Sequence, residues 1–86
     1  MEKINVKSLL LLVLQLDKEV ISSIQTDEYL TNYGLTSINL MQIILLIEEE
    51  YKIVFDLDDY FLEKLDTISK IENVIKKYKE KKNGIQ

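Results

Sequence analysis

The sequence predicts an all-α protein, a small four-helix bundle with three main helices and a short third helix. Proline is absent and glycine occurs only at positions 34 and 84, so few residues interrupt a helix. Apolar residues recur at helical spacing in three long segments. The 86 residues, 47% of them hydrophobic, suffice for one domain with one core. We therefore expect a single domain over residues 1–86, with its core at about 4–80 and a flexible tail at 81–86.

The first helix is expected from about Asn5, a residue type that caps helices, to about Leu16. Its apolar positions recur at helical spacing and are Leu9, Leu10, Val13 and Leu14. The basic start and apolar run resemble a secretory signal, but the run is too short to span a membrane. The stretch "DKEVISSIQ" after it lacks a small-residue cleavage site. We therefore expect a buried helix in a cytoplasmic protein that does not enter the membrane.

Residues 17 to about 35 show no sustained apolar period, so a loop is expected there. Loops of this length in a small domain are usually functional or well anchored. The expected anchors across the bundle are Val20, Ile21, Ile24, Tyr29, Leu30 and Tyr33.

The second helix is expected from about Ser37 to Lys52. Its buried stripe follows i, i+3, i+4, i+7 and i+11 and consists of Leu40, Ile43, Ile44, Ile47 and Tyr51. A second apolar stripe, Ile38, Met41 and Leu45, falls on a different face. One stripe suffices to pack a helix, so the second stripe is surplus to the core.

The remaining chain is expected to cross the bundle and then form two helices. The stretch "KIVFDLDDY" reads as a brief extended crossing with Ile53 and Phe55 pointing inward, and the short third helix starts near Asp58 or Asp59. Thr67 then caps the last helix. The inner side of that helix is expected to carry Ile68, Ile71, Val74 or Ile75, and Tyr78.

Histidine and cysteine are both absent, which excludes most catalytic and metal-binding arrangements. No Ser-His or Cys-His pair, zinc cluster or disulfide can be drawn from these residues. The 15 carboxylates could supply an acid–base pair, but so short a chain rarely encloses a cleft that excludes water. We therefore expect a protein that is not an enzyme and holds no metal.

The net charge of −4 is unevenly distributed along the chain. Residues 1–66 carry 5 Lys and 13 Asp or Glu, whereas residues 67–86 carry 6 Lys and 2 Glu. An acidic body argues against binding to nucleic acid, which requires a basic face. The lysines near the end complement the negative pole of the last helix.

The stretch "YGLTSINLMQIILLIEEEY", residues 33–51, places a glycine, two hydroxyl residues and an apolar helix in succession. The run from Gly34 to Ile38 resembles the Gly-x-Asp-Ser-Leu pattern of acyl and peptidyl carrier proteins, and residues 48–51 resemble the Glu-Glu-Phe-like end of their second helix. The later stretch "FLEKLDTISKIENVI" is similar to the family's short third helix, Asp-Thr cap and last helix. The resemblance covers residues 4–80 and implies the four-helix fold of these carriers.

The resemblance implies that a phosphopantetheinyl transferase attaches 4′-phosphopantetheine from coenzyme A to Ser37. The thiol of that arm would carry acyl or aminoacyl groups as thioesters to loading, condensing or tailoring enzymes, with the carrier acting as a monomer. A serine at a helix start is ordinarily a cap, but Thr36 can fill that role and leave the Ser37 hydroxyl free. Free N–H groups and the positive end of the helix dipole favour a phosphodiester there.

Three neutral residues stand where fatty-acid carriers tend to have acids: Thr36, Asn39 and Gln42. Because charge complementarity steers the choice of partner, their neutrality should weaken contacts with fatty-acid enzymes. We therefore expect a carrier of a specialised polyketide, nonribosomal-peptide or related thiotemplated pathway, with fatty-acid synthesis as the alternative.

The surplus stripe of Ile38, Met41 and Leu45 is the expected contact patch for partner enzymes. Alternatively, the loop at 17–35 folds over these three residues and buries them. A further alternative is that the whole chain is an unmodified helical interaction module, in which Ser37 is only a capping residue.

Overall fold

The computed structural model describes the backbone of residues 6–84 and the side chains of residues 6–80. The described chain forms four α-helices: α1 (Val6–Leu14), α2 (Lys18–Ser23), α3 (Ser37–Tyr51) and α4 (Ile68–Gly84). Three short 3-10 turns lie between them: η1 (Leu30–Tyr33), η2 (Leu57–Asp59) and η3 (Leu62–Lys64). The all-α bundle with three main helices, α1, α3 and α4, is therefore confirmed.

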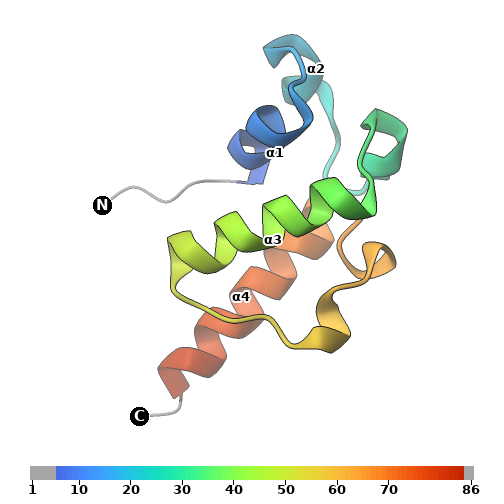
Figure 1. The fold of residues 1–86 in the computed structure, drawn as a ribbon. Coiled ribbons are helices and arrows are strands. Elements are labelled where there is room, and N and C mark those ends of the chain that lie inside the picture. The colour runs from blue at the N-terminus through green and yellow to red at the C-terminus, as the bar shows by residue number, and fades with distance from the viewer. Residues whose placement is uncertain (1–5, 85–86) are drawn as a thin grey trace.

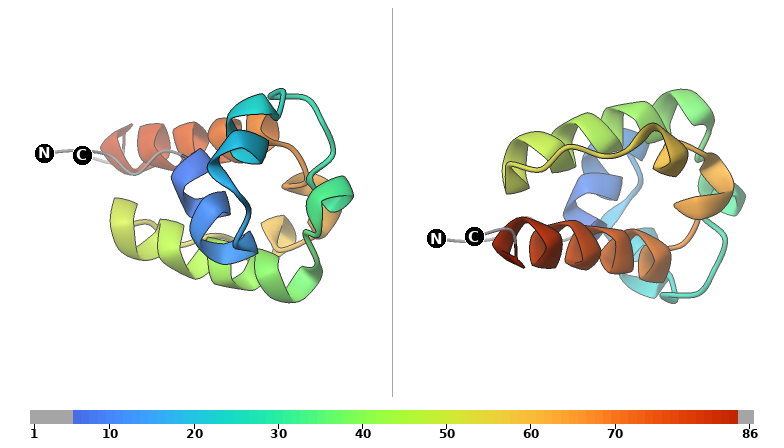
Figure 2. Two further views of the ribbon diagram at one scale, coloured as in Figure 1. Left: turned by 90° about the horizontal axis from the view of Figure 1, so that it is seen from above. Right: turned by 90° about the horizontal axis from the view of Figure 1, so that it is seen from below.

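The other three helices are arranged around α1, which contacts α2, α3 and α4 (Figure 1). In the two views of Figure 2, α1 lies on one side of α3 and α4, and the connection between α3 and α4 lies on the opposite side. The core between these layers is aliphatic and aromatic, and two polar residues, Asp59 and Thr67, are also buried. The nine most deeply buried large side chains are Leu10, Leu30, Leu40, Ile43, Ile44, Ile47, Leu65, Ile68 and Ile71.

Helix α1 buries the stripe that its sequence predicts. Leu9 and Leu10 are buried, and Val13 and Leu14 pack partly buried against the core. The helix ends at Leu14, two residues earlier than expected, because Gln15 adopts a left-handed backbone conformation with φ of 56°. The cap expected at Asn5 lies outside the described residues.

The segment expected to be a loop, residues 17–35, contains α2 and η1 instead. The six residues of α2 are too few to show a helical period of apolar residues, so the sequence pattern did not reveal this helix. Ile21, Ile24 and Leu30 are buried as predicted, and Val20 and Tyr33 are half-buried. Tyr29 is 56% exposed, so its assignment as a buried anchor is wrong.

Two backbone hydrogen bonds attach this segment to the start of α4. The N–H of Leu30 donates to the carbonyl of Asp66 at 2.7 Å, and the N–H of Ser69 donates to the carbonyl of Thr26 at 2.9 Å. These bonds hold the segment at the end of the bundle where α3 begins, so it does not cover the outer face of α3.

The short third helix expected from Asp58 or Asp59 is present as the two 3-10 turns η2 and η3. Phe61 has an extended backbone between the turns, and both Phe61 and Leu57 are largely exposed. A continuous helix here would therefore lack a sustained apolar face to bury. Ile53 and Phe55 do point inward, as expected of the preceding crossing.

Helix α4 begins at the predicted cap, where Thr67 Oγ1 accepts the N–H of Lys70 at 3.0 Å. Its buried side is the predicted one and consists of Ile68, Ile71, Ile75 and Tyr78, with Val74 half-buried. The helix continues to Gly84 and so includes the first part of the tail expected at 81–86. Residues 85 and 86 lie outside the described part, and the flexibility of the tail stays a prediction.

A buried carboxylate fixes the connection between α3 and α4 onto α4. The Tyr78 hydroxyl donates to Asp59 Oδ2, and it accepts the backbone N–H of Asp56 at 2.8 Å. Lys77 Nζ donates to the same carboxylate oxygen at 3.1 Å. The bond from Tyr78, with help from Lys77, holds the pKa of Asp59 below its ordinary value. Burial and the bond to Asp59 raise the pKa of Tyr78 to about 12.

Candidate functional site at the start of α3

A tight turn delivers the chain to the start of α3. Gly34 ends η1 with φ of 98°, a left-handed conformation that a residue with a Cβ adopts only at a cost. Directly after the turn, Leu35 is buried and its N–H donates to the carbonyl of Leu30 at 3.2 Å. The turn and this anchor together fix the position of the next two residues.

Thr36 and Asn39 close the first turn of α3 with a reciprocal pair of hydrogen bonds. Thr36 Oγ1 accepts the N–H of Asn39 at 3.3 Å, and Asn39 Oδ1 accepts the N–H of Thr36 at 3.2 Å. The Thr36 hydroxyl also donates to Asn39 Oδ1 at 2.9 Å. This capping box confirms the predicted capping role of Thr36. It also gives Asn39 a structural role that the sequence did not reveal.

Ser37 is the first residue of α3, and its side chain is exposed. Because Thr36 is the cap, the Ser37 hydroxyl has no hydrogen-bond partner among the described residues. The N–H groups of Ser37 and Ile38 belong to the first turn, where helices have no internal acceptors. The hydroxyl therefore stands free in solvent at the positive end of the helix dipole, where it is suited to carry a phosphate ester.

The surplus apolar stripe of α3 lies open to solvent. Ile38 is 75% exposed, Leu45 is 58% exposed and Met41 is 40% exposed. The alternative that residues 17–35 cover this stripe is therefore wrong. Gln42 is also exposed, whereas Asn39 is half-buried beside its capping partner. Of the three neutral residues Thr36, Asn39 and Gln42, only Gln42 takes no part in the capping box.

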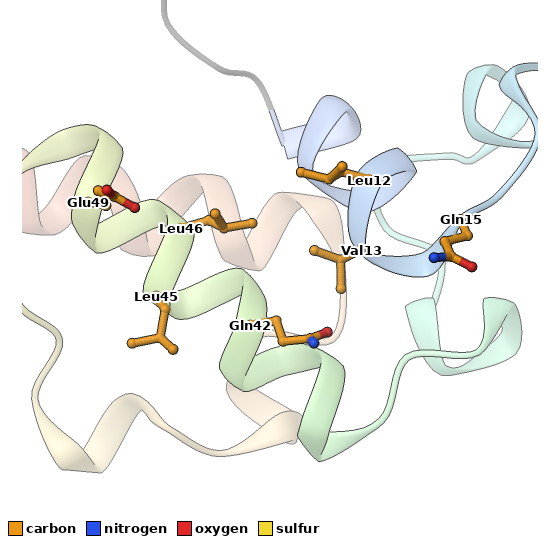
Figure 3. A pocket seen from close by; sticks show the side chains of 7 residues that line it. All are labelled: Leu12, Val13, Gln15, Gln42, Leu45, Leu46 and Glu49. Carbon is orange, nitrogen blue, oxygen red and sulfur yellow. The ribbon is translucent and has the colours of Figure 1, made fainter.

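A groove of about 390 Å³ lies between α3 and the end of α1 (Figure 3). Its lining residues are Leu12, Val13, Gln15, Gln42, Leu45, Leu46 and Glu49. The α1 side of this groove was not predicted. Leu12 belongs to the apolar run "LLLLVL" but lies outside the predicted buried stripe, and it is 66% exposed. This surplus apolar residue is the sequence signal that could have revealed the α1 side of the groove.

The comparison with protein families identifies the chain. A family model described as a phosphopantetheine attachment site matches residues 5–75. The chain belongs to this family of carrier proteins. Comparisons with curated proteins and with solved structures give no match.

Membership of the family has direct consequences for chemistry and partners. Its domains are non-catalytic carriers to which 4′-phosphopantetheine is covalently attached, and they work with a phosphopantetheinyl transferase and with the enzymes of a pathway. The free hydroxyl at the start of α3 fits such an arm. Among the described residues, no helix is both long and apolar enough to cross a membrane, and no group of His, Cys, Asp and Glu could hold a metal ion.

Proposed function

We propose that Ser37 carries the 4′-phosphopantetheine arm and that the chain acts as a carrier in a polyketide, nonribosomal-peptide or related thiotemplated pathway. One observation supports this above all: the capping box of Thr36 and Asn39 leaves the Ser37 hydroxyl exposed and unbonded. A capping serine would use its oxygen for the helix, whereas this serine offers its oxygen to another molecule.

The attachment step needs little from the carrier itself. Ser37 Oγ forms a bond to the pantetheine-bearing phosphorus of coenzyme A, and the bond from that phosphorus to the nucleotide part breaks. The transferase takes up the hydroxyl proton, so the absence of histidine from this chain is no obstacle. When bound, the arm supplies a thiol that holds the acyl or aminoacyl cargo as a thioester. The carrier contributes an accessible oxygen and the positive end of α3.

The partner surface that we propose surrounds this serine. Its apolar part is the exposed stripe of Ile38, Met41 and Leu45, and its polar part is Thr36, Asn39 and Gln42. Apolar side chains that cluster beside a reactive group, rather than occurring singly, favour a docking function. The neutrality of the polar part favours a specialised pathway over fatty-acid synthesis, whose enzymes would be attracted by acids at these positions.

Incubation of the chain with coenzyme A and a broad-specificity phosphopantetheinyl transferase tests the attachment. The intact mass should increase by one arm, and Ser37→Ala should abolish the increase. Ser69→Ala is the matched control, because Ser69 also lies in the first turn of a helix that a threonine caps. An unchanged mass with several transferases would favour the unmodified interaction module.

A further inference from the structure

We infer that Asn39 is a positioning residue for arm attachment, because it decides which of two adjacent hydroxyl residues caps α3. The inference rests on the proposed attachment at Ser37 and goes beyond it by naming the residue that keeps the Ser37 oxygen available. Asn39 acts through Thr36 and not on the reacting atoms.

Two residues compete for the cap of α3. Thr36 and Ser37 are adjacent, and each has a hydroxyl oxygen that can accept an N–H of the first turn. Serine is intrinsically the better cap of the two residue types. As the cap, Ser37 would turn its oxygen toward the helix and accept the N–H of Leu40, three residues further on. That arrangement would occupy the oxygen that the transferase must reach.

The bonds of Asn39 favour Thr36 as the cap. Asn39 Oδ1 accepts the N–H of Thr36 at 3.2 Å and the hydroxyl of Thr36 at 2.9 Å. Asn39 is three residues after Thr36, which is the spacing of a capping box. The residue three positions after Ser37 is Leu40, whose side chain is buried and has no acceptor. A capping box is therefore possible at Thr36 and impossible at Ser37.

The backbone agrees with this choice of cap. The N–H of Leu40 donates to the carbonyl of Thr36 at 2.9 Å, so it is not available to the Ser37 hydroxyl. Asn39 is half-buried, whereas Ser37 and Ile38, which precede it in the same turn, are exposed. The residue that directs the cap is thus held against the fold, and the serine faces solvent.

The kinetics of arm attachment test the role of Asn39. Asn39→Ala removes both bonds to Thr36, which should shift the ratio of the two caps about thirtyfold toward Ser37. Because only molecules with a free Ser37 hydroxyl react, the KM for the carrier should rise at least about threefold while kcat is unchanged. Asn39→Gln keeps a neutral amide oxygen of the kind that capping boxes use, and it should recover most of the lost kcat/KM.

Thr67→Ala is the matched control for a loss of stability alone. Thr67 caps α4 with the same kind of bond, since its Oγ1 accepts the N–H of Lys70 at 3.0 Å. Removing this cap should destabilise the fold and leave the KM for arm attachment unchanged. An equal rise of KM in Thr67→Ala and Asn39→Ala would overturn the inference, because a general loss of stability would explain both.

An NMR measurement on the chain without transferase distinguishes positioning from direct contact with that enzyme. In the original chain, the Hα–Hβ couplings of Ser37 should be averaged over rotamers, because its hydroxyl has no partner among the described residues. In Asn39→Ala they should approach the values of a single rotamer as Ser37 takes over the cap. Couplings that stay averaged, together with a raised KM, would show that Asn39 contacts the transferase directly and would overturn the inference.

A double variant tests whether Thr36 and Asn39 act as one unit. Thr36→Ala alone should also raise KM, since it leaves Ser37 as the one hydroxyl at the start of α3. Combining it with Asn39→Ala should raise KM by clearly less than the product of the two single changes. Effects that multiply would contradict the shared capping role.

Failure of the proposed attachment is distinguishable from failure of this inference. If the mass of the original chain does not increase with any transferase, both are overturned together. If its mass increases and Asn39→Ala reacts with the same KM as the original chain, the inference alone is overturned.

Discussion

The side chains of Thr36 and Asn39 satisfy each other's backbone N–H groups across the first turn of α3, at 3.3 and 3.2 Å. Ser37 lies between them and takes no part in the exchange. The Ser37 hydroxyl is therefore free because Thr36 and Asn39 complete the cap. The stability of α3 and the accessibility of Ser37 thus depend on the same pair of residues.

Replacing Thr36 with Ala should lower the free energy of unfolding by about 1 kcal/mol, because the N–H of Asn39 loses its acceptor. Urea denaturation followed by circular dichroism measures the change. Thr36→Ser keeps the acceptor oxygen and should recover most of the loss. Equal stability of the Ala variant and the original chain would contradict the capping role of Thr36.

Replacing Gly34 with Ala should cost about 1–2 kcal/mol of stability, because φ of 98° is unfavourable for a residue with a Cβ. The cost should come from the backbone alone, since no atom lies within 4 Å of the position that an added Cβ would occupy. Gly34→Asn should cost less, because Asn tolerates left-handed conformations better. Thermal denaturation of the two variants side by side measures the difference, and equal losses would refute this explanation.

The Asp59–Tyr78 pair should make stability depend on pH at both extremes. The lowered pKa of Asp59 means that its contribution is complete well above its ordinary value of 3.8 and is lost as the pH falls through the lowered pKa. Because the pKa of Tyr78 is raised to about 12, stability should also fall as the pH rises above about 10. Urea titrations across the pH range measure both limbs.

Asp59→Asn should flatten the acid limb and should cost about 1.5–3 kcal/mol at neutral pH, since it removes a charged hydrogen-bond acceptor. Asp58→Asn is the control, because Asp58 is the neighbouring carboxylate and is exposed. If the loss of stability at low pH persists unchanged in Asp59→Asn but disappears in Asp58→Asn, the role of the buried network is contradicted.

Replacing Gln42 with Glu should increase turnover of the loaded carrier by a condensing enzyme of fatty-acid synthesis. The new charge lies on the exposed face of α3 and leaves the capping pair of Thr36 and Asn39 intact. One favourable contact of about 1 kcal/mol would raise kcat/KM about fivefold. Asn73→Asp on the exposed side of α4 adds the same charge elsewhere and should have little effect. If both variants respond equally, charge at position 42 does not select the partner.

The parts of the fold that depend on local pattern could be predicted from the sequence. The two stripes of α3 differ by their helical phase, so the exposed set and four of the five residues of the buried set were assigned correctly. The fifth residue, Tyr51 at the end of the helix, is only half-buried. The caps at Thr36 and Thr67 were predicted for the same reason, because an N-cap bonds within its own turn.

The features that depend on tertiary contacts could not be predicted. Near Asp59, two 3-10 turns replace the continuous helix because side chains from other helices hold the chain there. The Tyr78 hydroxyl donates to Asp59, and Glu48 Oε2 accepts the N–H of Phe55 at 2.8 Å. Helix α2 is too short to display a period. The groove requires Leu12 and Leu46 from two helices to face each other, and a single stripe does not contain that information.

The fragment mass spectrum of the chain after reaction with coenzyme A and transferase tests the central claim most directly. The arm should be found on Ser37, and Thr36 and Asn39 should remain unmodified. An arm on Thr36 or on any other hydroxyl residue, or no arm at all, would contradict the claim that the capping box leaves Ser37 free for attachment.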